Sequence, residues 1–132
     1  MNIGTVAKRS GVSAKTIRYY ESVGLLPSVG RRDNGYRDYG EEDLQTLVFI
    51  RRARSLGFGM KEVGDLLALW RDSARASADV RALALGHIAE IDHKVAELQR
   101  LRGTLYDIVN RCHGDATPDC AIIDALTDLS AK

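Results

Sequence analysis

The longest uninterrupted feature of the sequence is the stretch from Ser77 to about Asn110, which contains no proline. Its apolar residues recur mostly every three or four positions, so they share one face of an α-helix. They are Val80, Leu83, Ile88, Ile91, Val95, Leu98, Leu101, Leu105 and Ile108. A helix of about 32 residues is roughly 48 Å long, and the rest of the chain is too short to cover such a stripe. We therefore expect the same helix of a second copy to pair with it.

The composition excludes a membrane-spanning protein. No apolar run approaches the roughly 18 residues that a transmembrane helix needs, and the first residues lack the apolar stretch of a signal peptide. We expect a cytoplasmic protein without a membrane partner. Thiols stay reduced in that compartment, so Cys112 and Cys120, the two cysteines of the chain, favour metal binding or catalysis over a structural disulfide.

Charge is divided unevenly along the chain, although the net charge is only +1. Residues 1–60 carry ten Lys and Arg against six Asp and Glu, whereas residues 61–132 carry nine against twelve. A basic first half with interspersed tyrosines favours a polyanionic partner, and an acidic second half does not. The sequence therefore predicts a nucleic-acid-binding part followed by a part with another task.

Two short helical segments separated by a glycine turn open the chain. The first ends at Gly11, and Ser13 is a suitable N-cap for the second. Two helices joined in this way form a helix-turn-helix, whose second helix enters the major groove of DNA. On that helix Lys15, Arg18 and Tyr19 fall at i, i+3 and i+4, so they share a face from which the cations can reach phosphates and guanine edges. The alternative is a basic face that is merely solvated.

A β-hairpin is predicted around Asn34-Gly35, because this dipeptide is a strong signal for a two-residue turn. Four cationic or aromatic residues flank it: Arg31, Arg32, Tyr36 and Arg37. Such a hairpin after a helix-turn-helix is typical of the wing of a winged helix, which lies along the DNA backbone. The alternative is an exposed turn with incidental arginines.

Two further helices are predicted after this hairpin, one after Gly40 and one after Gly59. The apolar residues expected to form their core faces are Leu44, Leu47, Val48 and Leu56 for the first, and Val63, Leu66, Leu67 and Trp70 for the second. We assign these residues to packing and to no chemistry.

Four short motifs occur in about the first 70 residues: Thr16-Ile-Arg-Tyr-Tyr-Glu21, Gly24-Leu-Leu-Pro27, Gly35-Tyr-Arg37 and Arg52-Ala-Arg-Ser-Leu-Gly-Phe58. In order and spacing they resemble the DNA-binding domain of MerR-type transcriptional regulators. The resemblance implies a dimeric winged helix-turn-helix protein on a pseudo-palindromic promoter. It also implies that the effector-bound dimer distorts this DNA, so that RNA polymerase can use promoter elements that are otherwise too far apart. The implied DNA contacts are Arg18, Tyr20, Tyr36, Arg37 and Arg54, to which Lys15, Tyr19 and Arg31 are added from the patterns above.

A mainly α fold in three parts is therefore expected. Residues 1–70 form the winged helix-turn-helix domain, and residues 71–110 form a linker and the long coiled-coil helix, whose antiparallel pairing is implied by the resemblance. Residues 111–132 form a metal-binding loop and a short C-terminal helix. His87 and His93 lie six positions apart on the long helix, which is the wrong spacing for two ligands on one face. We expect both to be ordinary helix residues.

The loop Cys-His-Gly-Asp-Ala-Thr-Pro-Asp-Cys, residues 112–120, is the candidate metal site. Gly114 and Pro118 favour a turn, and the apolar residues after Cys120 predict a short helix. The N-terminus of that helix is expected to lower the pKa of the Cys120 thiol and to offset anionic charge. Zn(II) usually takes about four ligands, whereas two soft thiolates suit Cu(I). This donor set favours Cu(I).

A second resemblance points to the same metal. MerR-type sensors of divalent metals have a further cysteine at the start of the dimer helix, where this chain has Ser77. Serine there, together with Cys-x7-Cys, resembles the copper-efflux regulators of the CueR and HmrR kind. The resemblance implies that Cys112 and Cys120 bind Cu(I), and also Ag(I) or Au(I), to activate copper efflux and detoxification genes. It further implies that Ser77 of one subunit covers the loop of the other, with Arg81 as a candidate supporting cation.

Alternatives for the two cysteines remain open. His113 could add a ligand for a harder divalent ion such as Zn(II), and a disulfide between the cysteines would make a thiol redox sensor. An iron–sulfur cluster wants about four cysteines, and the chain has two. An enzyme with Cys112 as nucleophile would need a base and an orienting group, and only His113 is near in sequence. We expect a regulator and not an enzyme.

Overall fold

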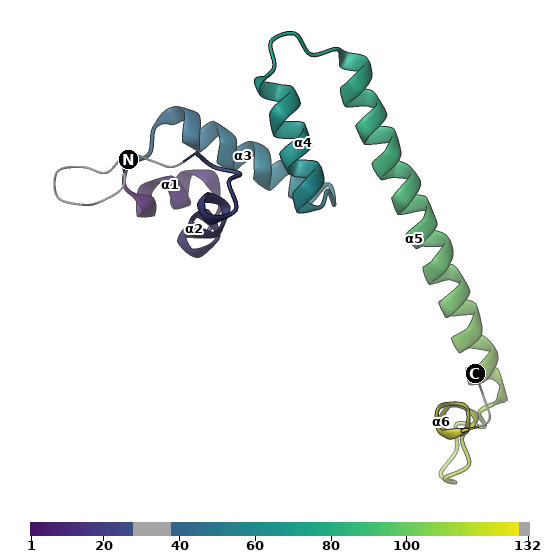
Figure 1. Cartoon of the computed structure of the whole chain (residues 1–132). Coiled ribbons are helices and arrows are strands. Elements are labelled where there is room, and N and C mark those ends of the chain that lie inside the picture. The colour runs from purple at the N-terminus through teal and green to yellow at the C-terminus, as the bar shows by residue number, and fades with distance from the viewer. Residues whose placement is uncertain (28–37, 130–132) are drawn as a thin grey trace. The chain divides into compact units, whose positions relative to one another are not determined.

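The computed structural model describes residues 1–27 and 38–129, and these residues form helices and no strands (Figure 1). The helices are α1 (Ile3–Ser10), α2 (Ala14–Ser22), α3 (Glu41–Ser55), α4 (Met60–Arg71), α5 (Ser77–Arg111) and α6 (Ala121–Thr127). The chain divides into two compact units, Met1–Leu83 and Ala84–Lys132. The first unit includes the start of α5, because Leu83 packs against its core. The predicted wing lies outside the described residues.

The pair α1 and α2 forms the predicted helix-turn-helix. Asn2 caps α1, because its Oδ1 accepts the N–H of Thr5 at 2.8 Å. Gly11 ends α1 with a φ of 76°, a left-handed conformation that favours glycine. Ser13 caps α2 as predicted, and its Oγ accepts the N–H of Thr16 at 3.2 Å. Local side-chain chemistry thus fixes both ends of the turn.

One hydrophobic core holds helices α1 to α4 of the first unit together. Its fully buried members come from all four of them: Val6 of α1, Ile17 of α2, Leu47 and Ile50 of α3, and Val63 of α4. Because Ile17 anchors α2 in this core, the opposite face of α2 remains free for a partner.

Two residues that were predicted to be in the core lie at the surface. Leu56 is 66% exposed, because α3 ends one residue before it and Ile50 and Ala53 form the buried face instead. Trp70 is 37% exposed and stacks on Phe49, with ring centroids 4.8 Å apart and 2° between the ring planes. The prediction for Leu56 was wrong, and Trp70 covers the edge of the core rather than entering it.

We expect Leu47→Ala to lower the free energy of unfolding by about 2–5 kcal/mol, because it deletes a fully buried side chain and leaves a cavity. Leu56→Ala is the matched control, since it removes the same atoms from an exposed side chain and should cost less than about 0.5 kcal/mol. Urea unfolding followed by circular dichroism measures both changes. Equal losses in the two variants would contradict this description of the core.

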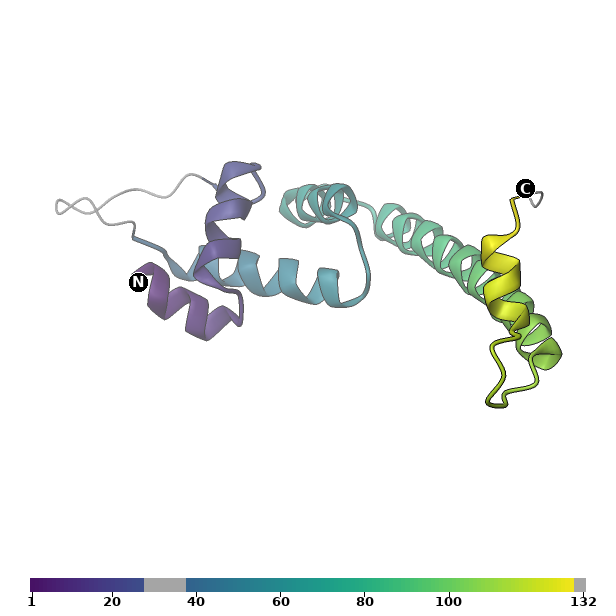
Figure 2. The ribbon, with the colours of Figure 1, turned by 90° about the horizontal axis from the view of Figure 1, so that it is seen from below.

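The second unit contains most of α5, the loop after it and α6. Helix α5 has 35 residues, or about 52 Å at 1.5 Å per residue, and α6 lies beside its C-terminal end (Figure 1, Figure 2). No residue of α5 is buried. Most of its large apolar side chains are 40–65% exposed: Leu85, Ile88, Ile91, Val95, Leu98, Leu101, Leu105, Tyr106 and Val109. Val80, Leu83 and Ile108 are less exposed, and Leu83 packs against the core of the first unit. The predicted apolar stripe is therefore uncovered from Ile88 to Leu105, whereas Leu83 at its start is covered by the core of the first unit. None of the described helices has the length and apolar character needed to cross a membrane.

Candidate metal centre and nucleic-acid interface

The loop after α5 brings the two cysteines together. Cys112 directly follows α5, and its N–H donates to the carbonyl of Val109 at 3.0 Å. Cys120 is the N-cap of α6. The two Sγ atoms are 3.5 Å apart and half-buried, which is much longer than a disulfide bond of about 2.05 Å. The loop thus presents two free thiols at one point.

Turn residues inside the loop reverse the chain between the cysteines. Gly114 has a φ of 64°, in the left-handed region that favours glycine. The Oδ1 atom of Asp115 accepts hydrogen bonds from the hydroxyl and the N–H of Thr117, at 2.5 and 2.9 Å. These bonds lower the pKa of the Asp115 carboxyl, so the carboxylate that makes the turn is the favoured form.

Local hydrogen bonds favour the thiolate form of Cys120. The largest contribution comes from the backbone N–H of Ile123, whose hydrogen bond lowers the pKa of the Cys120 thiol. Hydrogen bonds from the Cys112 thiol and from the N–H of Ile122 lower this pKa by smaller amounts. The carboxylate of Asp124 and partial burial act in the opposite direction and are weaker. The start of α6 therefore supplies donors to the sulfur, as the sequence predicted for this thiol.

We expect alkylation of Cys120 to have a pH midpoint below the ordinary thiol value of 9.0. A lowered pKa means that the reactive thiolate persists to lower pH, so the rate falls only when the pH drops below the lowered value. Iodoacetamide rates on reduced, metal-free protein, located on each cysteine by fragment mass spectrometry, measure this midpoint. The control is the same measurement on protein unfolded in urea. A pH midpoint for Cys120 in the native protein at or above its midpoint in the unfolded protein would contradict the lowered pKa.

Further ligands do not gather around the two sulfurs in the described part of one chain. No group of three or more His, Cys, Asp and Glu side chains there is arranged to hold a metal ion. The side chain of His113 is exposed. Ser77 and Arg81 are also exposed and lie in the first turns of α5, at the opposite end of the helix from Cys112.

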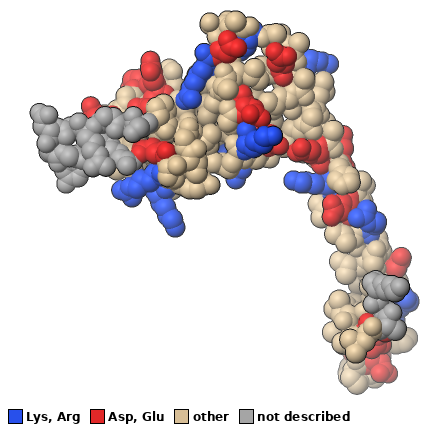
Figure 3. Space-filling model, viewed as in Figure 1, with Lys and Arg blue, Asp and Glu red and all other residues tan. Residues whose placement is uncertain are grey.

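The candidate DNA-binding face of α2 is open to solvent. Lys15, Arg18 and Tyr19 are all exposed, and Lys and Arg side chains project from the first unit near α1 and α2 (Figure 3). Arg54 of α3 is exposed too, and its Nη1 donates to the carbonyl of Phe58 at 3.0 Å. The exposure of these residues permits them to contact DNA, and these contacts stay predictions.

Tyr20 differs from the other candidate DNA contacts. Its side chain is only 7% exposed and belongs to the core, with its ring centroid 6.1 Å from that of Tyr19. Its side chain therefore packs in the core, and the implied DNA contact of Tyr20 stays a prediction. Arg31, Tyr36 and Arg37 lie outside the described residues.

One cation near the helix-turn-helix was missed from the sequence. Arg51 of α3 donates from its Nε to the backbone carbonyl of Ser10 at 2.8 Å. The two residues are 41 positions apart, and Arg51 belongs to none of the motifs. Only the folded structure reveals this contact.

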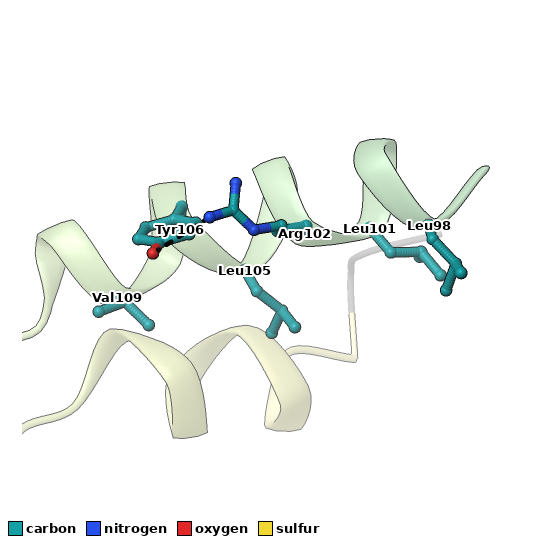
Figure 4. A pocket seen from close by; sticks show the side chains of 6 residues that line it. All are labelled: Leu98, Leu101, Arg102, Leu105, Tyr106 and Val109. Atoms are coloured by element: carbon teal, nitrogen blue, oxygen red, sulfur yellow. Dashed lines mark hydrogen bonds between the residues drawn. The ribbon is translucent and has the colours of Figure 1, made fainter. Parts of the chain in front are cut away.

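An apolar groove runs along the C-terminal half of α5 (Figure 4). It is lined by Leu98, Leu101, Arg102, Leu105, Tyr106 and Val109. Leu98, Leu105 and Val109 point to the same side of the helix in this view. The Arg102 guanidinium lies over the Tyr106 ring, 4.7 Å from its centroid, so the one charged residue of the groove is held on an aromatic neighbour.

Comparisons with known proteins agree with this architecture. The chain matches the MerR HTH family regulatory protein model over residues 1–69 and the MerR, DNA binding model over residues 44–108. It is 52% identical over 132 residues to heavy metal-dependent transcription regulator 2 of Rhizobium meliloti (strain 1021), covering 100% of this chain and 90% of the relative. It is 43% identical over 127 residues to the HTH-type transcriptional regulator CueR of Salmonella typhimurium (strain LT2), covering 96% and 92%.

A solved structure extends the likeness to the whole chain. The transcription regulator PbrR691 from Ralstonia metallidurans CH34, in complex with lead(II), has a TM-score of 0.85 and 36% identity, and the match covers 96% of this chain and 98% of that one. MerR regulators bind promoter DNA and act as dimers. The chain therefore belongs to the MerR family, and it is a metal-responsive, DNA-binding transcriptional regulator and not an enzyme.

Proposed function

We propose that this regulator is an activator that senses Cu(I) through Cys112 and Cys120 and switches on genes for copper efflux and detoxification. The observation that carries the proposal is the pair of free thiols with sulfurs 3.5 Å apart. Among the described residues no third ligand-type side chain joins them. A site with two sulfur ligands suits a monovalent soft ion, whereas a divalent ion such as Zn(II) usually takes about four ligands.

The distance between the sulfurs fits one shared ion. Two metal–thiolate bonds of about 2.3 Å each, the length found for zinc, span at most about 4.6 Å. The 3.5 Å separation therefore lets both sulfurs reach one ion with a small adjustment of the loop. The lowered pKa of Cys120 favours the thiolate that binds soft ions. Ag(I) and Au(I) share this chemistry and are expected to act as effectors too.

The relatives support copper and also define the main competitor. CueR and the HmrR proteins are among the similar sequences, and this chain has the Cys-x7-Cys spacing by which it resembles copper-efflux regulators of that kind. The lead(II) complex of PbrR691 keeps a divalent-metal sensor as a second candidate. Ser77 in place of the further cysteine of divalent sensors argues against that candidate, because it leaves the site short of thiolates.

A dimer completes the proposed site. The exposed apolar stripe of α5 would pair with α5 of a second copy, and an antiparallel arrangement would bring Ser77 and Arg81 of one copy to the metal loop of the other. A two-fold symmetric dimer suits a pseudo-palindromic operator with two half-sites. Metal binding would favour the dimer conformation that distorts the promoter for RNA polymerase, which requires a coupling of about 1–3 kcal/mol between two states.

Equilibrium metal binding tests the proposal. Reduced protein titrated under anaerobic conditions with buffered Cu(I) is expected to bind one ion per protomer, with both thiols protected from alkylation. Zn(II) at the same free concentration should leave the thiols reactive. Stoichiometric Zn(II) binding without Cu(I) binding would support the divalent sensor instead.

The closeness of the thiols also favours a second function, a redox sensor that forms a disulfide. That function predicts activation by a thiol oxidant in the absence of added metal, with loss of two free thiols per protomer. Activation by Cu(I) in fully reduced protein, reversed by a Cu(I) chelator, would exclude it.

A further inference from the structure

Arg51 lies against the end of α1 and acts on a backbone group that the helix leaves unpaired. Its Nε donates to the carbonyl of Ser10, the last residue of α1, at 2.8 Å. The last carbonyls of a helix have no partner within the helix, and a cation at this end is favoured by the helix dipole. Arg51 of α3 thus caps the C-terminal end of α1, across the packed faces of the two helices.

The side chain of Arg51 also fits closely over the turn that follows. A Cβ atom placed on Gly11 would lie 3.3 Å from the Cδ and Nε atoms of Arg51. Gly11 has a φ of 76°, a left-handed conformation that favours glycine, and a side chain there would require the Arg51 stem to shift by a few tenths of an ångström. The arginine stem and the glycine therefore determine together where the chain leaves α1 and how it enters α2.

Most of the guanidinium remains available for another partner. A guanidinium has five N–H donors in a fixed plane, and the bond to Ser10 uses the Nε donor. The side chain of Arg51 is exposed. Its planar Nη groups match the geometry of a phosphate, which arginine binds with two parallel hydrogen bonds.

The turn that Arg51 holds leads directly into α2, which carries Lys15, Arg18 and Tyr19 on its exposed face. Contacts to phosphates fix the orientation of a helix-turn-helix on DNA, and contacts to bases then read the sequence. We propose that Arg51 is a positioning residue for DNA binding: its Nε holds the turn through Ser10, and its Nη groups contact a DNA phosphate beside α2. This inference rests on the DNA binding of the family and is independent of the metal.

Three variants of α3 test the inference. Arg51→Gln removes both the charge and the fork, Arg51→Lys keeps the charge without the fork, and Arg52→Gln is the matched control. Arg52 is the next residue, is exposed, and carries the same charge. The probe is a duplex selected in vitro from a random library by the wild-type protein. Its binding by metal-free protein is measured at several salt concentrations, and thermal unfolding is recorded in parallel.

We expect Arg51→Gln to weaken DNA binding about tenfold and to reduce the slope of log affinity against log salt by about 1, because one phosphate contact is lost. Arg51→Lys should keep the wild-type slope with a smaller loss of affinity, and Arg52→Gln should keep both close to wild type. An unchanged slope in Arg51→Gln, the same loss in Arg52→Gln, or a reduced slope in Arg51→Lys would overturn the phosphate contact. Cu(I) binding by all three variants separates this result from the proposed metal function, since the thiols lie in the other unit.

Discussion

Replacing Cys112 or Cys120 by serine is expected to abolish activation by Cu(I) while leaving DNA binding in place. Each variant removes one of two sulfurs that lie 3.5 Å apart, and a hydroxyl oxygen is a poor ligand for a soft ion. Loss of an outer partner of a metal site typically costs about 10–100-fold in affinity, so loss of one ligand out of two should cost more. A transcriptional reporter with added copper, together with DNA binding by the purified variants, measures both consequences.

His113→Ala is the matched control for these variants, because it changes the neighbouring residue of the same loop. The side chain of His113 is exposed, so the response to Cu(I) should survive its removal. A serine variant that still activated transcription with copper would contradict the assignment of the ligands. Loss of the metal response in His113→Ala would instead place a nitrogen ligand in the site and favour a divalent ion.

Leu98→Asp is expected to convert the protein to a monomer and to weaken specific DNA binding by about 100-fold or more. Leu98 is 65% exposed within the apolar groove of α5 (Figure 4), and a carboxylate there would have to be buried without a partner when two copies pair. The magnitude follows from losing simultaneous binding to two half-sites, for which linked sites typically gain about 10²–10⁴-fold. Sedimentation equilibrium gives the oligomeric state, and operator binding gives the affinity.

Ala96→Asp provides the comparison for Leu98→Asp. It introduces the same charged side chain on the same helix, two residues earlier and on roughly the opposite face, since successive residues turn by about 100°. Ala96 is exposed, and this variant should remain a dimer with normal operator binding. A dimeric Leu98→Asp protein would show that the apolar stripe of α5 is not the dimer interface.

Features that depend on local chemistry were predictable from the sequence. The turn between α1 and α2 follows from a glycine that tolerates a left-handed conformation and a serine that caps the next helix, and both act as expected at Gly11 and Ser13. The long α5 helix follows from its periodic apolar residues. The approach of Cys112 to Cys120 follows from turn residues between them.

Features that depend on tertiary packing were not predictable in the same way. Leu56 continues an apolar pattern, but the helix ends before it, so periodicity alone misplaced it. Tyr19 and Tyr20 are neighbours in a motif, yet α2 turns one to solvent and the other into the core. Arg51 meets Ser10 only because α1 and α3 pack together. A motif match reports none of these orientations.

Transcription in response to a panel of metals tests the central claim most directly. A promoter that carries the operator of this protein is transcribed with RNA polymerase, reduced regulator and one buffered metal at a time. Cu(I) and Ag(I) are expected to activate transcription from wild-type protein and to fail with Cys112→Ser or Cys120→Ser, while Zn(II) and lead(II) leave it at the basal level. Activation by Zn(II) or lead(II) without activation by Cu(I) would contradict the proposal that this regulator senses copper.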